Sequence, residues 1–146
     1  MITLRHFVKR VRVPKKFNPK ISAIFGRIAL ELGDRAEKYV EEVFDKAESE
    51  DKLPSWLLGW ERKKKYSTMD KKGVDFMFHT VDVGPIFINI KSSQMNALRF
   101  EREHPDGGIR AVVVNILDPP MTTYGKVIGA VARQRDKFLS LRAAPA

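Results

Sequence analysis

The stretch PIFINIKSSQ, residues 85–94, decides the predicted fold. Side chains alternate between the two faces of a strand, so its three isoleucines lie together on one face. That face predicts a strand packed against a hydrophobic core. The opposite face carries Asn89 and Lys91, an amide and an ammonium two residues apart, which indicates a polar site on the other side of the sheet.

The segment before this strand predicts its partner. VDFMFHTV, Val74 to Val81, alternates well enough for a strand, and the sequence DVGP supplies a turn between the two segments. We expect the two strands to pair as an antiparallel hairpin. In that pairing Asp75, near the start of the first strand, lies close to Lys91, near the end of the second.

A long amphipathic helix precedes the hairpin. Apolar residues recur at spacings of three and four from Ile21 to about Glu48, which is the pattern of one buried helical stripe. Gly33 weakens this helix and is a candidate position for a break or kink. Glu37 lies at the rim of the buried face and Glu42 borders its opposite flank, so periodicity alone does not choose between the two carboxylates.

The remaining elements are expected to be shorter. Three segments have weaker patterns: residues 55–67, ambiguous between a short helix and a strand; residues 68–73, a loop; and residues 94–104, with helical character. Ile109 to Leu117 predicts a fully buried strand that two prolines end. Thr122 or Thr123 can then cap a final helix of about 20 residues.

These elements predict an α/β fold with a central mixed sheet flanked by helices, built by residues 1–146 as a single domain. With 146 residues, 43% of them hydrophobic, the chain is long enough for a real core. The basic segment 1–20 is either an arm or an edge strand. The chain has no cysteine, which excludes a disulfide framework and a thiolate zinc site.

Net charge and targeting signals point to a class of partner. The formal net charge is +9, which attracts polyanions because each neutralised phosphate releases counterions. We expect a nucleic-acid partner rather than an acidic protein. The sequence shows neither a secretory signal nor an apolar run of the roughly 20 residues that a membrane span needs, so we expect a cytoplasmic protein with no membrane association.

Polar and basic residues near the hairpin are candidate contacts to a phosphate backbone. They are Arg62, Lys63, Lys64, Lys65, Lys71, Lys72, Ser92, Ser93 and Gln94. A charge run is equally typical of a solvated surface, and helix capping explains the two serines as well.

The residues at the end of the hairpin suit a hard divalent cation. Such an ion binds oxygen ligands, usually one or two carboxylates together with waters and phosphate. Asp75 would be the main ligand, and the side chain of Asn89 and the backbone carbonyl of Ile90 could complete the shell. Lys91 could orient an attacking water or offset charge that develops on a phosphate. The alternative is that Asp75 forms a structural ion pair with a lysine, for which Lys71, Lys72 and Lys91 are the candidates.

Three stretches, LGDRAEKYVEEVF, KKGVDFMF and PIFINIKSS, resemble the motifs of the PD-(D/E)XK nuclease superfamily, and most of all its small archaeal Holliday-junction-resolvase-like members. That family combines a helix glutamate, a Gly-x-Asp strand and a strand ending in (D/E)-x-K. Glu37 matches the glutamate, Asp75 the metal-binding aspartate and Lys91 the lysine. Over roughly residues 30–117 the resemblance implies a restriction-endonuclease-like αβββαβ core, Mg²⁺ or Mn²⁺ as cofactor, DNA as substrate and a homodimer.

One position departs from the family pattern. Asn89 stands where the family has Asp or Glu, and an amide oxygen brings no charge to a cation. Either Glu101 or Glu103 replaces the missing carboxylate, or Glu37 suffices. Three functions therefore stay open: a metal-dependent nuclease that hydrolyses DNA by metal-activated water, a catalytically degenerate nuclease-fold module that binds nucleic acid, and a basic protein-interaction domain.

Overall fold

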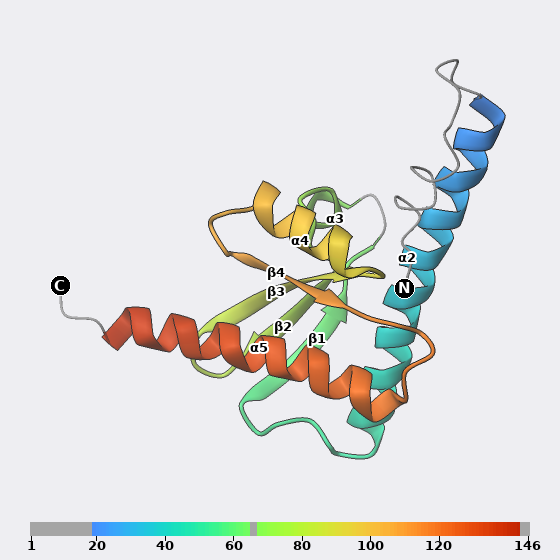
Figure 1. Ribbon diagram of the computed structural model, residues 1–146. Helices are drawn as coiled ribbons and strands as arrows, with labels where there is room; N and C mark the ends of the chain where they lie inside the picture. The colour runs from blue at the N-terminus through green and yellow to red at the C-terminus, as the bar shows by residue number, and fades with distance from the viewer. Residues whose placement is uncertain (1–18, 65–66, 144–146) are drawn as a thin grey trace.

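A four-stranded mixed sheet forms the centre of the fold (Figure 1). This computed structural model describes residues 19–64 and 67–143. The strands lie side by side in chain order: β1 (Leu57–Arg62), β2 (Phe76–Thr80), β3 (Gly84–Lys91) and β4 (Ile109–Val113). β1, β2 and β3 pair antiparallel, whereas β3 and β4 pair parallel. The predicted hairpin and mixed sheet are confirmed, and the ambiguous residues 55–67 contain a strand.

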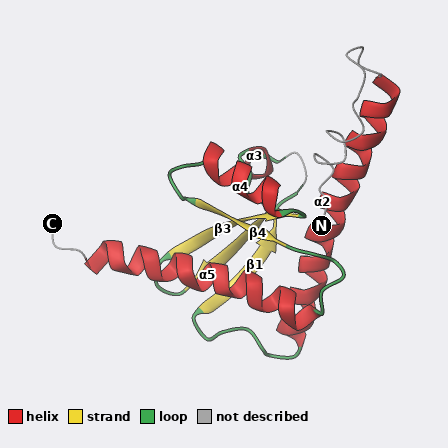
Figure 2. Cartoon of the chain, viewed as in Figure 1, coloured by secondary structure: helices red, strands yellow, loops and turns green. Residues whose placement is uncertain are grey.

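Helices cover both faces of this sheet (Figure 2). They are α2 (Pro19–Ser49), α3 (Thr68–Lys71), α4 (Gln94–Glu103) and α5 (Pro120–Ala143). α2 and α5 contact each other and pack on one face, and α4 packs on the other face against β3 and β4. α2 stays helical through Gly33, so no break occurs there, and its N-terminal half projects beyond the sheet (Figure 1).

The predicted basic arm or edge strand, residues 1–20, lies outside the described residues except for its last two, which begin α2. Within the described ranges, none of the helices is both long and apolar enough to span a membrane.

The isoleucine face of β3 packs into the core, as its alternation predicts. Ile86 and Ile88 are fully buried and Ile90 is 4% exposed. Phe44 of α2 lies over this face of the sheet, with its ring centre 5.2 Å from that of Phe78 on β2. Burying each large apolar side chain stabilises the fold by roughly 1.5–3 kcal/mol. The opposite face of β3 is therefore the one available for polar chemistry.

The expectation of a loop at residues 68–73 is wrong, because this segment contains α3. Ser67 caps the helix, since its side chain accepts a hydrogen bond from the backbone N–H of Asp70 at 3.2 Å. A serine followed three residues later by an acid is a known capping pattern. The helix has four residues, too few to show an apolar period, so only the cap could have revealed it.

The strand expected from Ile109 to Leu117 ends at Val113. The side chain of Asn115 accepts a hydrogen bond from the N–H of Leu117 at 2.9 Å, an Asx turn that leads the chain out of the sheet. The strand is also not fully buried, because β4 is at the edge of the sheet and Arg110 is exposed. Apolar composition alone gave no sign of that edge position.

α5 begins before the threonines that were expected to cap it. The Pro119 carbonyl accepts hydrogen bonds from the N–H groups of Thr122 at 3.0 Å and Thr123 at 3.3 Å, so both threonines lie in the first turn. Pro120 fits the first helical position because no intrahelical bond needs its missing N–H. The helix is consequently longer than expected, at 24 residues.

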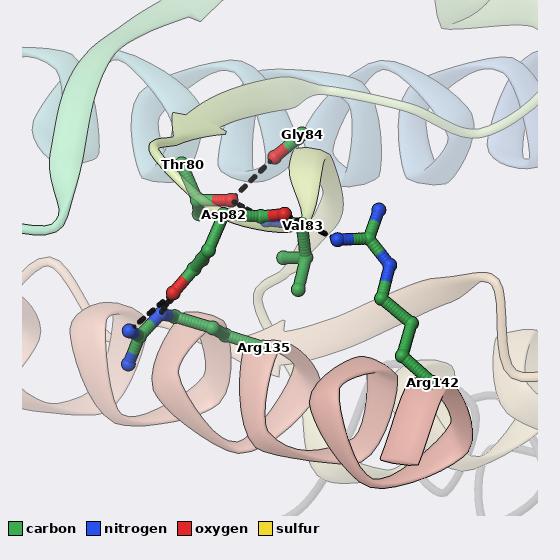
Figure 3. Close-up of polar contacts among 6 residues, drawn as sticks. All are labelled: Thr80, Asp82, Val83, Gly84, Arg135 and Arg142. Atoms are coloured by element: carbon green, nitrogen blue, oxygen red, sulfur yellow. Dashed lines mark hydrogen bonds and ion pairs between the residues drawn. The ribbon is translucent and has the colours of Figure 1, made fainter. Parts of the chain in front are cut away.

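The turn between β2 and β3 is fastened to α5 (Figure 3). Asp82 accepts hydrogen bonds from Nε of Arg135 at 3.0 and 3.1 Å, and Arg142 donates to the Asp82 carbonyl. The Arg135 guanidinium also lies 5.0 Å from the centre of the Trp56 ring. The Thr80 hydroxyl donates across the turn at 2.7 Å. These contacts fix the end of the hairpin that is far from Asp75.

Gly73 allows the chain entering β2 to pass close to α4. Its φ is +93°, a region that residues with side chains rarely adopt. A Cβ at this position would lie 2.6 Å from Cε2 of Phe100 on α4. Both the backbone conformation and the contact therefore require glycine, two residues before Asp75.

We expect Gly73→Ala to lower the free energy of unfolding by about 2–4 kcal/mol, from a strained φ together with an overpacked contact. Denaturant unfolding measures this change. Gly125→Ala is the matched control, because a Cβ at Gly125 meets nothing within 4 Å and alanine favours a helix. Equal losses in the two variants, or no loss in Gly73→Ala, would contradict the role given to Gly73.

Candidate functional site

A cavity of about 310 Å³ opens where the end of β3 meets α2 and α4. Its lining includes polar residues from separate parts of the chain: Asp34 and Glu37 on α2, Asp70 on α3, Asp75 before β2, and Asn89, Lys91 and Ser92 at the end of β3. The hairpin pairing thus brings the aspartate, the amide and the lysine expected from the sequence into one cavity.

Asp75 is built into the hydrogen-bond pattern between β2 and β3. Its N–H donates to the Ile88 carbonyl at 3.0 Å, and its carbonyl accepts from the N–H of Lys63 at 2.8 Å. Its carboxylate Oδ2 accepts from the N–H of Ile90 at 2.7 Å. The N–H and C=O of one strand residue point to the same side, so the Ile90 carbonyl also faces the Asp75 side of β3. These bonds fix the carboxylate, which belongs to a residue only 8% exposed.

The carboxyl of Glu37 shares a proton with that of Asp75. Burial, and secondly the Asp75 charge, raise the pKa of Glu37 to about 8, against an opposing influence of Arg62. Burial raises the pKa of Asp75 to about 6, although the Ile90 N–H and the Lys91 ammonium favour its ionised form. Of the two neighbouring carboxyl groups, that of Glu37 therefore ionises less readily.

The alternative helix carboxylate, Glu42, is exposed and does not line this cavity. Of the two glutamates that periodicity could not separate, Glu37 is thus the one beside Asp75. Which flank of α2 faces the end of the sheet depends on how the helix packs, and that orientation is not written in the helix sequence.

Asp70 joins the two acids and was not among the residues expected from the sequence. One carboxylate oxygen from each of Glu37, Asp70 and Asp75 lies within 4.8 Å of the other two. Asp70 reaches this position from α3, so missing the helix meant missing the residue. The capping pattern from Ser67 to Asp70 is the signal that could have found it.

Asn89 contributes an amide oxygen that lacks a hydrogen-bond partner among the described residues. Its Nδ2 donates to the Gly73 carbonyl at 2.7 Å, which sets the orientation of the amide and leaves Oδ1 buried and unpaired. The residue is 3% exposed. An unsatisfied buried acceptor costs about 1–3 kcal/mol, so Oδ1 marks a place where a ligand atom would relieve that cost.

Lys91 supplies positive charge at the same cavity. Its Nζ lies 5.2 Å from the centre of the Phe100 ring, and its charge acts on Asp75. Within the described residues no ion pair joins Asp75 to Lys71, Lys72 or Lys91, the three partners that the sequence left open. Lys91 is the lysine that lines the cavity, and it acts on Asp75 through its charge without a direct ion pair.

The glutamates considered as replacements for the missing acid lie elsewhere. Glu101 faces Arg110 at 3.9 Å and Glu103 pairs with Arg99 at 3.2 Å. Neither lines the cavity. The acid that lies beside Glu37 and Asp75 is Asp70 of α3, and the sequence order of these acids does not reveal which helix places an acid there.

Arg62 ties β1 to α2, where an exposed phosphate contact was expected. It donates to Asp34 at 3.1 Å and to Glu41 at 3.2 Å, and its side chain is 25% exposed. These two acids, Asp34 and Glu41, lie on either side of Glu37 in the sequence of α2. Arg62 thus holds in place the part of the helix that carries Glu37.

The lysines expected to contact phosphate differ in whether their side chains are paired or exposed. Lys63 is paired with Glu61 on β1. Lys65 lies outside the described residues. The others have exposed side chains close in sequence to Asp70, and they are Lys64, Lys71 and Lys72.

The three polar residues after Lys91 separate in space. Ser92 lines the cavity. Ser93 caps α4 by accepting a hydrogen bond from the N–H of Asn96 at 3.3 Å, the structural explanation left open by the sequence. Gln94 is exposed and lines a different cleft, of about 650 Å³, between α4, β4 and α5, together with Arg110, Lys126 and Arg133.

Comparisons of the chain with protein-family models, curated proteins and solved structures find no match. What the protein does must be inferred from the cavity. Carboxylate oxygens and one amide oxygen are the ligands that a hard divalent cation prefers, and no soft thiolate ligand exists in this chain. The residues present therefore fit Mg²⁺ or Mn²⁺.

The shared proton predicts an unusual dependence of stability on pH when a chelator is present. The ordinary pKa of Glu37 is 4.5 and its folded value is about 8, so between these values the folded chain keeps a proton that the unfolded chain has released. The free energy of unfolding should therefore fall as pH rises from about 5 to 8. Glu37→Gln removes this titration while keeping a neutral hydrogen-bond donor, and should flatten the profile and raise the melting temperature at pH 9 by roughly 2–4 °C.

Thermal unfolding followed by circular dichroism between pH 5 and 9 measures both effects. Glu42→Gln is the control, because Glu42 is exposed on the same helix. Its profile should run parallel to that of the wild type. A Glu37→Gln profile that also runs parallel would contradict a proton shared with Asp75.

Proposed function

We propose that this protein is a metal-dependent nuclease of restriction-endonuclease-like fold, which hydrolyses DNA phosphodiester bonds with Mg²⁺ or Mn²⁺. The observation that carries the proposal is a cluster of three carboxylates, those of Glu37, Asp70 and Asp75, in a cavity that Asn89, with its unpaired amide oxygen, and Lys91 also line. Structural ion pairs alone do not explain this set, because the acids outnumber the base and two of them share a proton.

The order of the elements supports the proposed fold. α2, β1, β2, β3, α4 and β4 follow the αβββαβ order of the family that the motifs resemble, with α3 inserted between β1 and β2. The helix glutamate, the aspartate before β2 and the lysine at the end of β3 line one cavity in that arrangement. The likeness thus extends from the motifs to the way in which the chain brings them together.

The proposed chemistry divides between the acids and the lysine. Asp75, Glu37, Asp70 and the amide oxygen of Asn89 would hold the cation, with the Ile90 carbonyl facing the same side of β3. A bound divalent cation would polarise a phosphate and lower the pKa of a water molecule. Asp75 is fixed by the Ile90 N–H, so little reorganisation is needed to present its free oxygen.

Lys91 would act on the phosphate and the attacking water. Its ammonium lies close enough to influence the Asp75 carboxylate and rests near the face of Phe100, which limits its movement. In this position it can orient water for in-line attack, or offset negative charge that develops on the phosphate oxygens. No covalent intermediate is required.

Exposed lysines near the site support DNA as the partner. Lys64, Lys71 and Lys72 are exposed beside the segment that carries Asp70, and the whole chain has a net charge of +9. A homodimer acting on two strands is the arrangement that the family resemblance implies. The homodimer and the cytoplasmic location expected from the sequence both belong to this proposal.

A second function, a nucleic-acid-binding module without cleavage, is favoured by one observation. The nitrogen of the Asn89 side chain is engaged by the Gly73 carbonyl, so only a neutral oxygen is offered where the family has a carboxylate. Ion affinity would then depend on the acids that remain. Metal-dependent cleavage separates the two functions.

We expect the protein to cut branched, single-stranded or duplex DNA with Mn²⁺ or Mg²⁺ and to leave it intact with EDTA. Lys91→Ala should slow cleavage by at least about 100-fold, the size of effect seen when a group that stabilises developing charge is removed. Lys46→Ala, at an exposed position near the end of α2, should cut at the wild-type rate. Cleavage that survives EDTA or Lys91→Ala would refute the assigned chemistry, and metal-independent binding without cleavage would favour the binding module.

The dependence of binding on salt separates both of these functions from a protein-interaction domain. Contact with about six phosphates should give a plot of log affinity against log salt concentration with a slope near −5. Fluorescence anisotropy with a labelled duplex between 50 and 200 mM salt measures it. Weak binding that hardly changes with salt would indicate a protein partner instead.

A further inference from the structure

We propose that Asp70 supplies the carboxylate that is missing at position 89, and that a divalent cation held by Asp70, Asp75 and Asn89 fastens the basic segment around α3 to the sheet. The inference rests on the proposed metal site and adds to it a ligand and a consequence for the DNA-binding surface. Its new ligand, Asp70, lies just before the KKGVDFMF stretch and is not one of the residues matched to the family pattern.

The acid cluster provides the first observation. The Asp70 carboxylate approaches both Glu37 and Asp75, with ligand atoms within 4.8 Å of one another. The three acids come from separate elements, α2, α3 and the start of β2, so their approach is a property of the tertiary fold. Carboxylates brought together in a partly buried site repel one another unless a proton or a cation lies between them.

The Asn89 side chain provides an independent observation. Asn89 lines the same cavity, and its Oδ1 is buried and has no hydrogen-bond partner among the described residues. The bond from its Nδ2 to Gly73 excludes the flipped amide, which would place two oxygens 2.7 Å apart. A cation satisfies an amide oxygen and carboxylates together and also offsets the charge of the carboxylates, which a bridging water does not.

The charges explain why a carboxylate at position 70 can replace one at position 89. A neutral amide at 89 leaves Asp75 and Glu37 as the acids inherited from the family pattern. Asp70 adds a third acid to this cluster, so three carboxylates are offered to a divalent ion although residue 89 is neutral. Three carboxylates and one amide oxygen still leave positions for water on an ion that prefers six ligands.

The attachment of α3 makes the second half of the inference testable. α3 has no buried residue and is held by short-range bonds, such as those from the N–H of Gly73 to the Asp70 carbonyl at 2.9 Å and from the N–H of Val74 to the Met69 carbonyl at 3.0 Å. A segment with so little burial opens at low cost in free energy. An ion that binds only the closed form suppresses this opening by mass action. Lys71 would then be presented to DNA in a fixed position only when the ion is bound.

Isothermal titration calorimetry with Mn²⁺ tests the ligand. Asp70→Asn and Asp75→Asn should each weaken Mn²⁺ binding by at least about tenfold, because each removes one charged ligand. Asp45→Asn, the same chemical change at an exposed position of α2, should bind as the wild type does. Circular dichroism confirms that each variant is folded before titration.

The outcomes separate this inference from the proposed function. Wild-type affinity in Asp70→Asn, with binding lost in Asp75→Asn, overturns the role of Asp70 and leaves the proposed nuclease intact. A wild-type protein that binds no Mn²⁺ at millimolar concentration overturns both. Loss in Asp70→Asn with retention in Asp75→Asn would support Asp70 as a ligand and refute the proposed catalytic centre.

Limited trypsin digestion tests the attachment of α3. With Mn²⁺ at ten times its dissociation constant, cleavage after Lys71 and Lys72 should slow by about tenfold in the wild type. Cleavage after Lys137 on α5, followed by mass spectrometry in the same samples, should not change. Unchanged cleavage at α3, or equal protection in Asp70→Asn at ten times its own dissociation constant, overturns the proposed link between the ion and the basic segment.

Discussion

The hydrogen bond from the Ile90 N–H to the Asp75 carboxylate is the contact on which the candidate site depends. The Asp75 carboxylate accepts a hydrogen bond from a backbone N–H at the end of the antiparallel pair of β2 and β3, so the position of this acid is fixed by the sheet. Hydrogen bonds to charged groups are stronger than those between neutral groups, which helps to offset the burial of a carboxylate in a residue 8% exposed. The pKa of Asp75 still rises to about 6, so burial outweighs the bond and the nearby lysine. The second acid, Glu37, accommodates the charge by keeping its proton.

Order around this contact comes from further pairs of residues, some of which are in the lining of the cavity. Arg62 binds two acids of α2 on either side of Glu37 and so fixes the helix against β1. Gly73 brings the chain before β2 so close to Phe100 that no side chain fits between them. At the other end of the hairpin, Asp82 and Arg135 fasten the turn to α5. These contacts hold the acids together although they take no part in the proposed chemistry. The carboxylates repel one another, and the surrounding contacts keep their oxygens in a fixed arrangement.

Patterns with a clear period were predictable from the sequence, and features without one were not. The alternation of β3 gave the strand and its buried face, because several residues repeat one pattern. The stripe of α2 gave the helix, but the expectation that it is buried from Ile21 onward is wrong: Ile21, Ile28 and Leu32 are exposed, and burial begins at Ala36. The hairpin then followed, and with it the approach of Asp75 to Lys91. The sequence could not reveal which flank of α2 faces the sheet, so Glu37 and Glu42 stayed equivalent until packing was known. To predict the place of Asp70, one would have to recognise a helix of four residues, for which the N-cap is the only signal in the sequence. The role of Arg62 could not be predicted because its acidic partners lie near it only after folding.

The uninterrupted course of α2 has a mechanical consequence. From its first residue to Glu37 the helix rises about 27 Å, at 1.5 Å for each residue, and much of this length projects beyond the sheet. Its C-terminal half is anchored in the core by side chains such as Val40 and Phe44, both fully buried. Ala36, next to Glu37, is also buried, and Arg62 binds Asp34 and Glu41 on either side of it, so Glu37 belongs to the anchored part of the helix. The projecting part therefore extends the surface of the molecule without giving freedom of movement to that carboxyl group.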